Sequence, residues 1–192
     1  LIPELSNNQL AIFRNTSVTG TPSFAAKIPF TGLTEAIATA TGDLDGDGNP
    51  DIAVANYSNG QLSIYKNLST PGTISVAPRV IYTIPACTDE VSIADIEVDG
   101  KLDLLITASI QGLIVMRNQG VTGVIDATTF AAGVTFATGP NAYPVALGDL
   151  DGDGKLDAVV ANANTYTLSV FRNTSTPGTV SFATFVTLTT NT

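Results

Sequence analysis

Apolar residues recur along the chain in short runs of four to eight positions, and glycine, proline, asparagine and serine separate these runs. The runs are rich in Val, Ile, Phe, Tyr and Thr, which favour extended strands over helices. One set of runs lies at residues 52–56, 104–108 and 158–162. A second set lies at residues 9–15, 61–67, 112–118 and 167–173, and a third at residues 23–30, 74–81, 128–136 and 181–188.

The order of these runs repeats, with an acidic loop before each member of the first set. The loops begin at Asp43, Asp95 and Asp149, and each unit predicts four strands, A to D, with the loop between A and B. Strands B and C carry apolar side chains on both faces, as residues 112–116 illustrate. A sheet with one wet face would alternate apolar and polar residues, so these sheets must be covered on both sides. Four-stranded sheets of ~40–50 residues that pack around an axis are propeller blades.

The predicted fold is therefore all-β, a β-propeller of four-stranded antiparallel blades. Residues 1–34 predict strands C and D of an incomplete blade, and three full blades follow at residues 35–86, 87–140 and 141–192. The total is about three and a half blades, whereas closed propellers have at least four. We interpret the chain as a partial ring, either an excerpt of a larger propeller such as a seven-bladed one or half of an assembly. Further blades or a partner chain would close the ring.

The charge of the chain is concentrated in the three loops. The formal net charge is −9, and twelve of the 17 acidic residues lie in these loops. Because no basic stripe is present to meet phosphates, we do not expect nucleic acid as a partner. No apolar run reaches the ~18 residues that a transmembrane segment needs.

The first loop, GDLDGDGNPD, has the oxygen spacing of a cation site. Counted from Asp43, carboxylates stand at positions 1, 3, 5 and 9, with Gly48 at position 6 and Asn49 at position 7. Side-chain oxygens at alternate positions and a carbonyl at position 7 suit a hard cation of calcium size. An EF-hand would need Glu at position 12, where this chain has Val54 in the middle of a strand.

The pattern D-x-D-x-D-G-x-x-D between two strands, repeated at ~50–60 residues, resembles the FG-GAP/VCBS repeat, the calcium-loop blade of integrin-α-type β-propellers. The resemblance covers nearly the whole chain. It implies two or three Ca²⁺ ions, one per acidic loop, with weaker binding in the middle loop, where Glu97 and Val98 depart from the pattern. The implied ligands are four side chains and one backbone carbonyl in each loop: Asp43, Asp45, Asp47, Asp51 and the Asn49 carbonyl; Asp95, Glu97, Asp99, Asp103 and the Lys101 carbonyl; Asp149, Asp151, Asp153, Asp157 and the Lys155 carbonyl.

The resemblance also implies a setting and a role. Extracellular calcium modules bind at ~10⁻⁴–10⁻³ M, so we expect an extracellular protein, secreted or on the cell surface. The general character of the sequence favours a bacterial source. The expected role is a non-catalytic adhesion or recognition module that binds a protein or a carbohydrate. The alternatives are a lectin with sugar sites between blades, the non-catalytic propeller of a larger secreted enzyme such as a polysaccharide lyase, and a passive spacer. The chain has no histidine, which excludes His-based catalytic triads.

Two further features allow a functional and a structural interpretation. Strand C ends in a repeated triplet, which would form either a ligand-binding ring or blade packing with a turn-forming Asn: residues 13–15, 65–67, 116–118 and 171–173. Asp89 and Glu90 precede strand A of the second unit, where they would contact a ligand in the channel or lie in a solvated loop.

Overall fold

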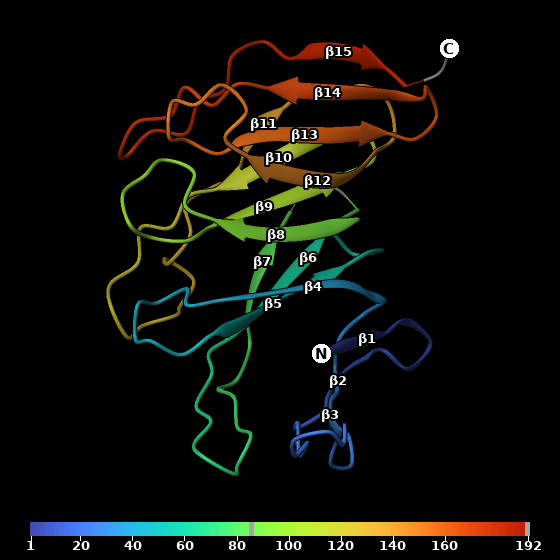
Figure 1. Cartoon of the computed structure of the whole chain (residues 1–192), viewed down its shortest axis with the longest axis vertical. Helices are drawn as coiled ribbons and strands as arrows, with labels where there is room; N and C mark the ends of the chain where they lie inside the picture. The colour runs from blue at the N-terminus through green and yellow to red at the C-terminus, as the bar shows by residue number, and fades with distance from the viewer. Residues whose placement is uncertain (85–86, 191–192) are drawn as a thin grey trace.

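The computed structural model describes residues 1–84 and 87–190 of the 192-residue chain. Within these residues the chain forms four antiparallel sheets that follow one another in sequence (Figure 1). The all-β prediction is confirmed, and the sheets are consistent with propeller blades.

Each sheet is built from strands that are consecutive in the chain. The first sheet contains β1 (Ile2–Glu4), β2 (Gln9–Ile12) and β3 (Ile28–Phe30), with the single helical turn η1 (Leu5–Asn7) between β1 and β2. The second contains β4 (Ala36–Gly42), β5 (Asp51–Asn56), β6 (Gln61–Tyr65) and β7 (Val80–Thr83). The third contains β8 (Glu90–Ala94), β9 (Asp103–Ala108), β10 (Gly112–Met116) and β11 (Val134–Phe136). The fourth contains β12 (Ala142–Gly148), β13 (Asp157–Asn162), β14 (Thr167–Phe171) and β15 (Val186–Thr189).

The apolar core lies between the sheets, in three clusters that each join two successive sheets. In β9, Leu104 and Ile106 belong to the cluster shared with the second sheet, and Leu105 belongs to the cluster shared with the fourth. Successive side chains of a strand point to opposite faces, so both faces of the third sheet are covered. This two-sided burial explains why strands B and C show no alternation between apolar and polar residues.

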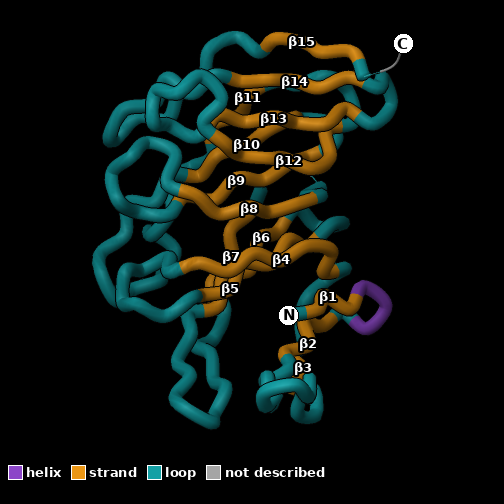
Figure 2. Tube along the Cα trace, in the orientation of Figure 1, coloured by secondary structure: helices purple, strands orange, loops and turns teal. Residues whose placement is uncertain are grey.

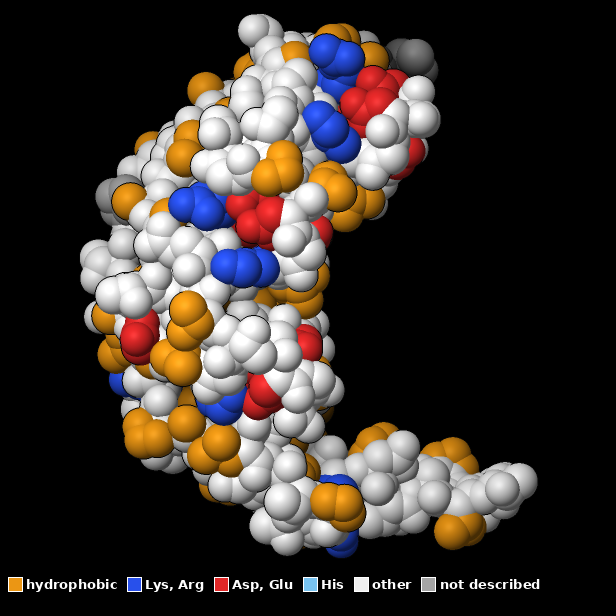
Figure 3. Space-filling view, turned by 90° about the vertical axis from the view of Figure 1, so that its left-hand side faces the viewer, with side chains coloured by type: hydrophobic (Ala, Val, Ile, Leu, Met, Phe, Trp, Pro, Cys, Tyr) orange, Lys and Arg blue, Asp and Glu red, His pale blue; other side chains and the backbone are white. Residues whose placement is uncertain are grey.

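The four sheets form an open arc. In Figure 3 the molecule is a crescent with one concave side. Figure 2 shows the longer loops gathered at one end of the stacked strands. Among the described residues, no helix has the length and apolarity needed to cross a membrane.

The first sheet has one strand more than we expected. Residues 1–34 predict strands C and D alone, but β1 pairs with β2 and takes the place of strand B. Its pairing of Glu4 with Gln9 matches the pairing of Asn56 with Gln61 in the second sheet. Pro3 conceals this strand in the sequence, because proline disfavours strands in general; it is tolerated here because β1 is an edge strand that pairs only with β2. The incomplete sheet therefore lacks only strand A.

The D strands are shorter than the sequence predicts. β7, for example, begins at Val80, although the apolar run begins at Ile74. The earlier part of each run pairs through an isolated bridge with the Asn that follows strand C, as Val76 does with Asn67. This part forms a hairpin beyond the sheet, closed in the second sheet by the turn at residues 70–73. The predicted boundary between residues 86 and 87 falls in part on residues outside those described.

Candidate metal centre

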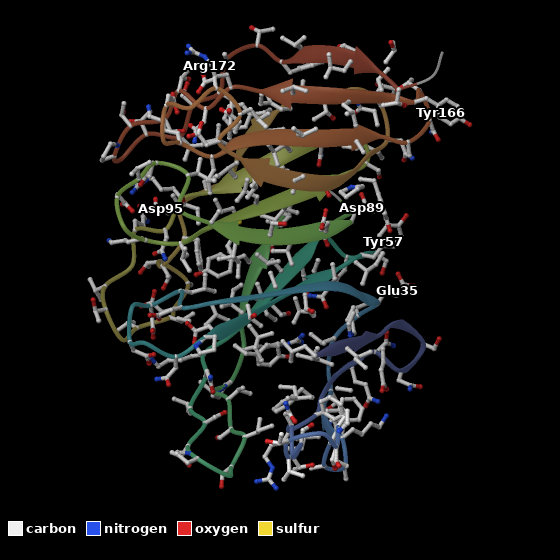
Figure 4. The ribbon with its side chains drawn as sticks, viewed as in Figure 1. Glu35, Tyr57, Asp89, Asp95, Tyr166 and Arg172 are labelled. Atoms are coloured by element: carbon white, nitrogen blue, oxygen red, sulfur yellow. The ribbon has the colours of Figure 1, made fainter. Side chains whose placement is uncertain are left out.

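The three acidic loops connect strand A to strand B in the three four-stranded sheets. They are loop 1 (residues 43–51), loop 2 (residues 95–103) and loop 3 (residues 149–157). In Figure 4, Asp95 of loop 2 and Arg172 lie on the same side of the molecule, and Glu35, Tyr57, Asp89 and Tyr166 lie on the opposite side. The loops therefore belong to one rim of the arc, away from the turns that connect strands B and C.

Loop 1 brings three carboxylates together. Oxygen atoms of Asp43, Asp45 and Asp51 lie within 4.8 Å of one another. The backbone holds this arrangement, because Asp43 accepts hydrogen bonds from the N–H groups of Asp47 (3.0 Å) and Gly48 (2.9 Å). Gly48 has a φ of +89°, a conformation that glycine adopts without steric cost. Asp47 lies outside the triad.

Loop 3 forms a similar triad from Asp149, Asp151 and Asp153, again within 4.8 Å. Asp149 accepts from the N–H groups of Gly152 (2.7 Å) and Gly154 (2.9 Å). All three carboxylates are exposed. Asp157, the fourth predicted ligand, lies outside this triad.

Loop 2 does not gather its carboxylates in this way: among the described residues only loops 1 and 3 contain a triad within 4.8 Å. Glu97 is fully buried, and no described residue hydrogen-bonds to its carboxylate oxygens. Burial, followed by the side-chain contact with Asp99 and the charge of Asp103, raises the pKa of Glu97 to about 7. Val98 has a φ of +56° at a position where loops 1 and 3 have glycine, so its backbone is strained. The geometry of loop 2 therefore differs from that of loops 1 and 3, and its weaker calcium binding stays a prediction.

The carboxylate at position 9 has a second role that the sequence did not reveal. Asp51 accepts from the N–H of Leu44 in its own loop (3.0 Å) and from the N–H of Asn67 after strand C (2.8 Å). Asp103 and Asp157 repeat both bonds, at 2.7 to 2.9 Å. Burial raises the pKa of Asp51 and of Asp103 to about 6. These aspartates fasten each loop to the residue that follows strand C.

The residues at position 7 lie beside the loop carboxylates. The backbone N–H groups of Asn49, Lys101 and Lys155 each donate to the carboxylate at position 5 at 2.9 Å. The side chains of Lys101 and Lys155 extend away to the backbone carbonyls of Gly120 (2.8 Å) and Ser175 (2.7 Å). Only main-chain groups of these lysines therefore remain close to the loop carboxylates.

The Asn of the strand C triplet connects successive sheets. Asn118 donates from Nδ2 to the carbonyl of Leu44 in loop 1 (2.7 Å), and Asn173 donates to the carbonyl of Ile96 in loop 2 (2.8 Å). The aromatic or Met residue of the triplet is buried in three sheets, at Tyr65, Met116 and Phe171. These contacts favour the packing interpretation of the triplet over a ligand-binding ring.

Residue 66 of the triplet carries a cationic group into loop 1. The Lys66 ammonium contacts Asp45 directly and lies 2.7 Å from Asp47. Partial desolvation lowers the pKa of Lys66, but the hydrogen bonds to the two aspartates outweigh it and raise the pKa to about 12. Figure 3 shows basic side chains beside acidic ones along the crescent. Loop 1 can therefore hold positive charge in this geometry.

Comparison with protein families gives a match over residues 4–54, 43–106 and 95–160 to the FG-GAP-like repeat. The chain belongs to this family. The second and third matched segments each begin at an acidic loop and end in the strand B that follows the next acidic loop. Successive matches are therefore displaced by one sheet along the chain. A comparison with curated proteins gives no match.

The two triads fit the metal site that FG-GAP-like repeats imply. Their donors are carboxylate oxygens alone, which hard cations prefer over nitrogen or sulfur ligands. In loop 1 the Lys66 ammonium stands in for a cation against Asp45. The residues that could hold a metal ion are therefore Asp43, Asp45 and Asp51 in loop 1 and the three aspartates of loop 3.

Sequence reasoning missed the Lys66 contact, although a signal was present. Lys66 follows Asp45 by 21 residues, Arg117 follows Glu97 by 20, and Arg172 follows Asp151 by 21. This nearly constant offset pairs each basic residue with position 3 of the loop in its own repeat.

Proposed function

We propose that this chain is an extracellular, calcium-stabilised propeller module that serves adhesion or recognition and does not catalyse a reaction. The observation that carries the proposal is the pair of aspartate triads, each gathered within 4.8 Å on the same rim of an FG-GAP-like repeat domain. Calcium bound there would neutralise crowded carboxylates and brace the turn between strands A and B. Millimolar calcium outside cells would fill such sites at affinities of ~10⁻⁴–10⁻³ M.

Thermal unfolding in millimolar calcium and in chelator tests the calcium part of this proposal. If free calcium is about 20 times the dissociation constant, each site stabilises the fold by about 1.8 kcal/mol. Two sites then raise the melting temperature by about 7–14 °C for a domain of this size. Magnesium at the same concentration is expected to do less, because it gives up its water ligands reluctantly. Equal melting temperatures in calcium and chelator would contradict the assignment.

We propose a carbohydrate as the partner. Its site would lie where strands A begin, at the ends of these strands that face away from the acidic loops. A cavity of about 190 Å³ lies between strands A of three sheets, lined by Asp89, Glu90 and Tyr143 among others. Tyr143 is half exposed, and an exposed aromatic ring beside carboxylates can stack on a sugar while the carboxylates accept hydrogen bonds from the sugar's hydroxyl groups. Asp89 and Glu90 also accept backbone bonds from Ser109 (2.7 Å) and Val145 (2.9 Å), which fixes their position.

A glycan array in calcium and again in chelator tests this lectin candidate, with Tyr143→Ala as the variant and Tyr166→Ala as its control. Tyr166 is exposed but does not line the cavity. Binding that Tyr143→Ala abolishes and Tyr166→Ala retains would support a sugar site at the cavity. Binding to no glycan would favour a protein partner or a spacer role.

We also propose that further blades or a partner chain complete the ring. Leu44 and Ile96, at position 2 of loops 1 and 2, are 2% and 0% exposed because the next sheet covers them. Leu150, the equivalent residue of loop 3, is 59% exposed. An added sheet that supplies an Asn to loop 3 would repeat the contact seen twice within the chain. Light scattering distinguishes a self-assembled ring, which doubles or multiplies the mass, from a monomer that needs further blades.

A further inference from the structure

Each four-stranded sheet places one basic side chain, from the end of strand C, against position 3 of its own acidic loop. The three contacts differ in kind. The Lys66 ammonium contacts Asp45 directly and also lies 2.7 Å from Asp47. The guanidinium groups stay farther away, with Arg117 at 3.7 Å from Glu97 and Arg172 at 3.8 Å from Asp151.

Loop 1 is therefore the loop in which a basic side chain shares a triad carboxylate at hydrogen-bonding distance. The Asp45 side chain is fully buried, and the Lys66 side chain is 18% exposed, so solvent screens this pair little. In loop 3, Arg172 is 60% exposed and Asp151 is 38% exposed. An exposed ion pair of this kind has little effect on stability or affinity.

Lys66 also has a third partner, which would hold its ammonium if it moved away from Asp45. Its ammonium donates to the backbone carbonyl of Gly123 at 3.1 Å. Gly123 lies in the hairpin of the next sheet, and its N–H donates to the carbonyl of Asp45 at 2.8 Å. The lysine thus connects loop 1 to the following sheet.

We propose that Lys66 is a built-in counter-cation of loop 1 that competes with calcium for Asp45 and sets the calcium affinity of this loop. This proposal rests on the calcium-stabilised function proposed above. A divalent ion in the triad needs the Asp45 oxygens and is repelled by an ammonium beside the same carboxylate. Without calcium, the same ammonium neutralises part of the loop and preserves its fold. Loop 3 has no such competitor among the described residues and takes up calcium first.

The test measures calcium binding by titration calorimetry in variants that isolate one loop. Lys66→Met removes the charge and keeps a stem of similar shape, and it is placed in the Asp151→Asn background, which disables loop 3. Arg172→Met is the matched control, in the Asp45→Asn background, which disables loop 1. We expect Lys66→Met to tighten calcium binding by loop 1 about tenfold, equivalent to about 1.4 kcal/mol. We expect Arg172→Met to change binding by loop 3 by less than about twofold.

Two further measurements test the charge and the position of the residue 66 side chain. Lys66→Arg, which copies the other repeats, should tighten binding less than Lys66→Met because it retains the charge. In chelator, Lys66→Met should melt at a lower temperature than the parent, because Asp45 and Asp47 lose their counter-cation. Unchanged calcium affinity in Lys66→Met, or an equal gain in Arg172→Met, would overturn the role of Lys66 and leave the calcium-stabilised function intact. Absence of calcium binding in the parent chain would overturn both.

Discussion

The hydrogen bond between Asn118 and loop 1 offers a direct test of how successive sheets are coupled. Asn118 Nδ2 donates to the carbonyl of Leu44 across the sheet interface (2.7 Å) and to the carbonyl of Leu102 in its own loop (3.0 Å). Asn67 provides the matched control, because its Nδ2 donates to the equivalent carbonyl of its own loop, at Pro50 (2.9 Å). The N–H two residues after each Asn donates to its Oδ1 at 2.9 Å. The two residues thus differ in the bond that crosses between sheets and in burial.

Asn118→Ala leaves the Leu44 carbonyl buried without a partner, at a cost of about 1–3 kcal/mol beyond the local bonds that both variants lose. We expect Asn118→Ala to be about 2 kcal/mol less stable than Asn67→Ala, which lowers the melting temperature by about 4–8 °C more. Urea unfolding of both variants, followed by circular dichroism in chelator, measures this difference.

Asn173→Ala tests whether the loss of stability expected for Asn118→Ala also occurs at the next interface between sheets. Asn173 is buried and makes the same two bonds, to the carbonyls of Ile96 (2.8 Å) and Leu156 (2.9 Å). It should match Asn118→Ala within about 0.5 kcal/mol, the usual precision of such comparisons. If all three alanine variants lose the same stability, the reasoning about coupling between sheets is refuted.

Three other predictions concern the loops and one turn. The pKa of Asp51 and of Asp103 is raised to about 6, mainly by desolvation, so the folded state holds protons that the unfolded state releases and stability in chelator should fall as pH rises from 5 to 7. A higher melting temperature in chelator at pH 7 than at pH 5 would contradict this. Val98→Gly should relieve left-handed strain worth about 1 kcal/mol and raise the melting temperature by about 2–4 °C, and a decrease would show that the strain is absent. Gly112→Ala should cost at least about 2 kcal/mol in urea unfolding, because its Cβ would lie 2.5 Å from the Phe136 carbonyl at a φ of +99°, and a neutral result would refute the close approach.

The sequence predicts a strand well where burial inside the stack of sheets alone determines its pattern of apolar residues. Strands B and C carry apolar side chains on both faces because a sheet packs on each side, as Leu104 and Leu105 demonstrate in β9. Strand D was predicted too long, since its first residues are apolar but belong to a hairpin beyond the sheet. β1 was missed because it is short and contains Pro3, although Glu4 and Gln9 have the same separation as Asn56 and Gln61.

The candidate site could be predicted in part for a similar reason. Spacing within a loop places Asp43 and Asp45 near one another, because they are close in sequence and the turn is tight. Spacing cannot tell which carboxylates converge, since Asp51 enters its triad while Asp157 remains outside. Contacts such as Lys66 with Asp45 depend on how strand C ends beside the loop, which only the register of paired strands defines.

The position of the triads indicates where calcium would act on the fold. Asp51 accepts one backbone hydrogen bond from Leu44 within loop 1 and one from Asn67 after strand C, so it ties the loop to the end of that strand. The carbonyl of Leu44 lies between two triad residues in the chain and accepts the bond from the next sheet. An ion held by Asp43 and Asp45 would therefore rigidify the backbone at the joint between sheets. Each sheet buries its core only against its neighbours, so the stability of the arc depends on the interfaces between sheets. An ion that strengthens one such interface would therefore stabilise the whole arc and not one loop alone.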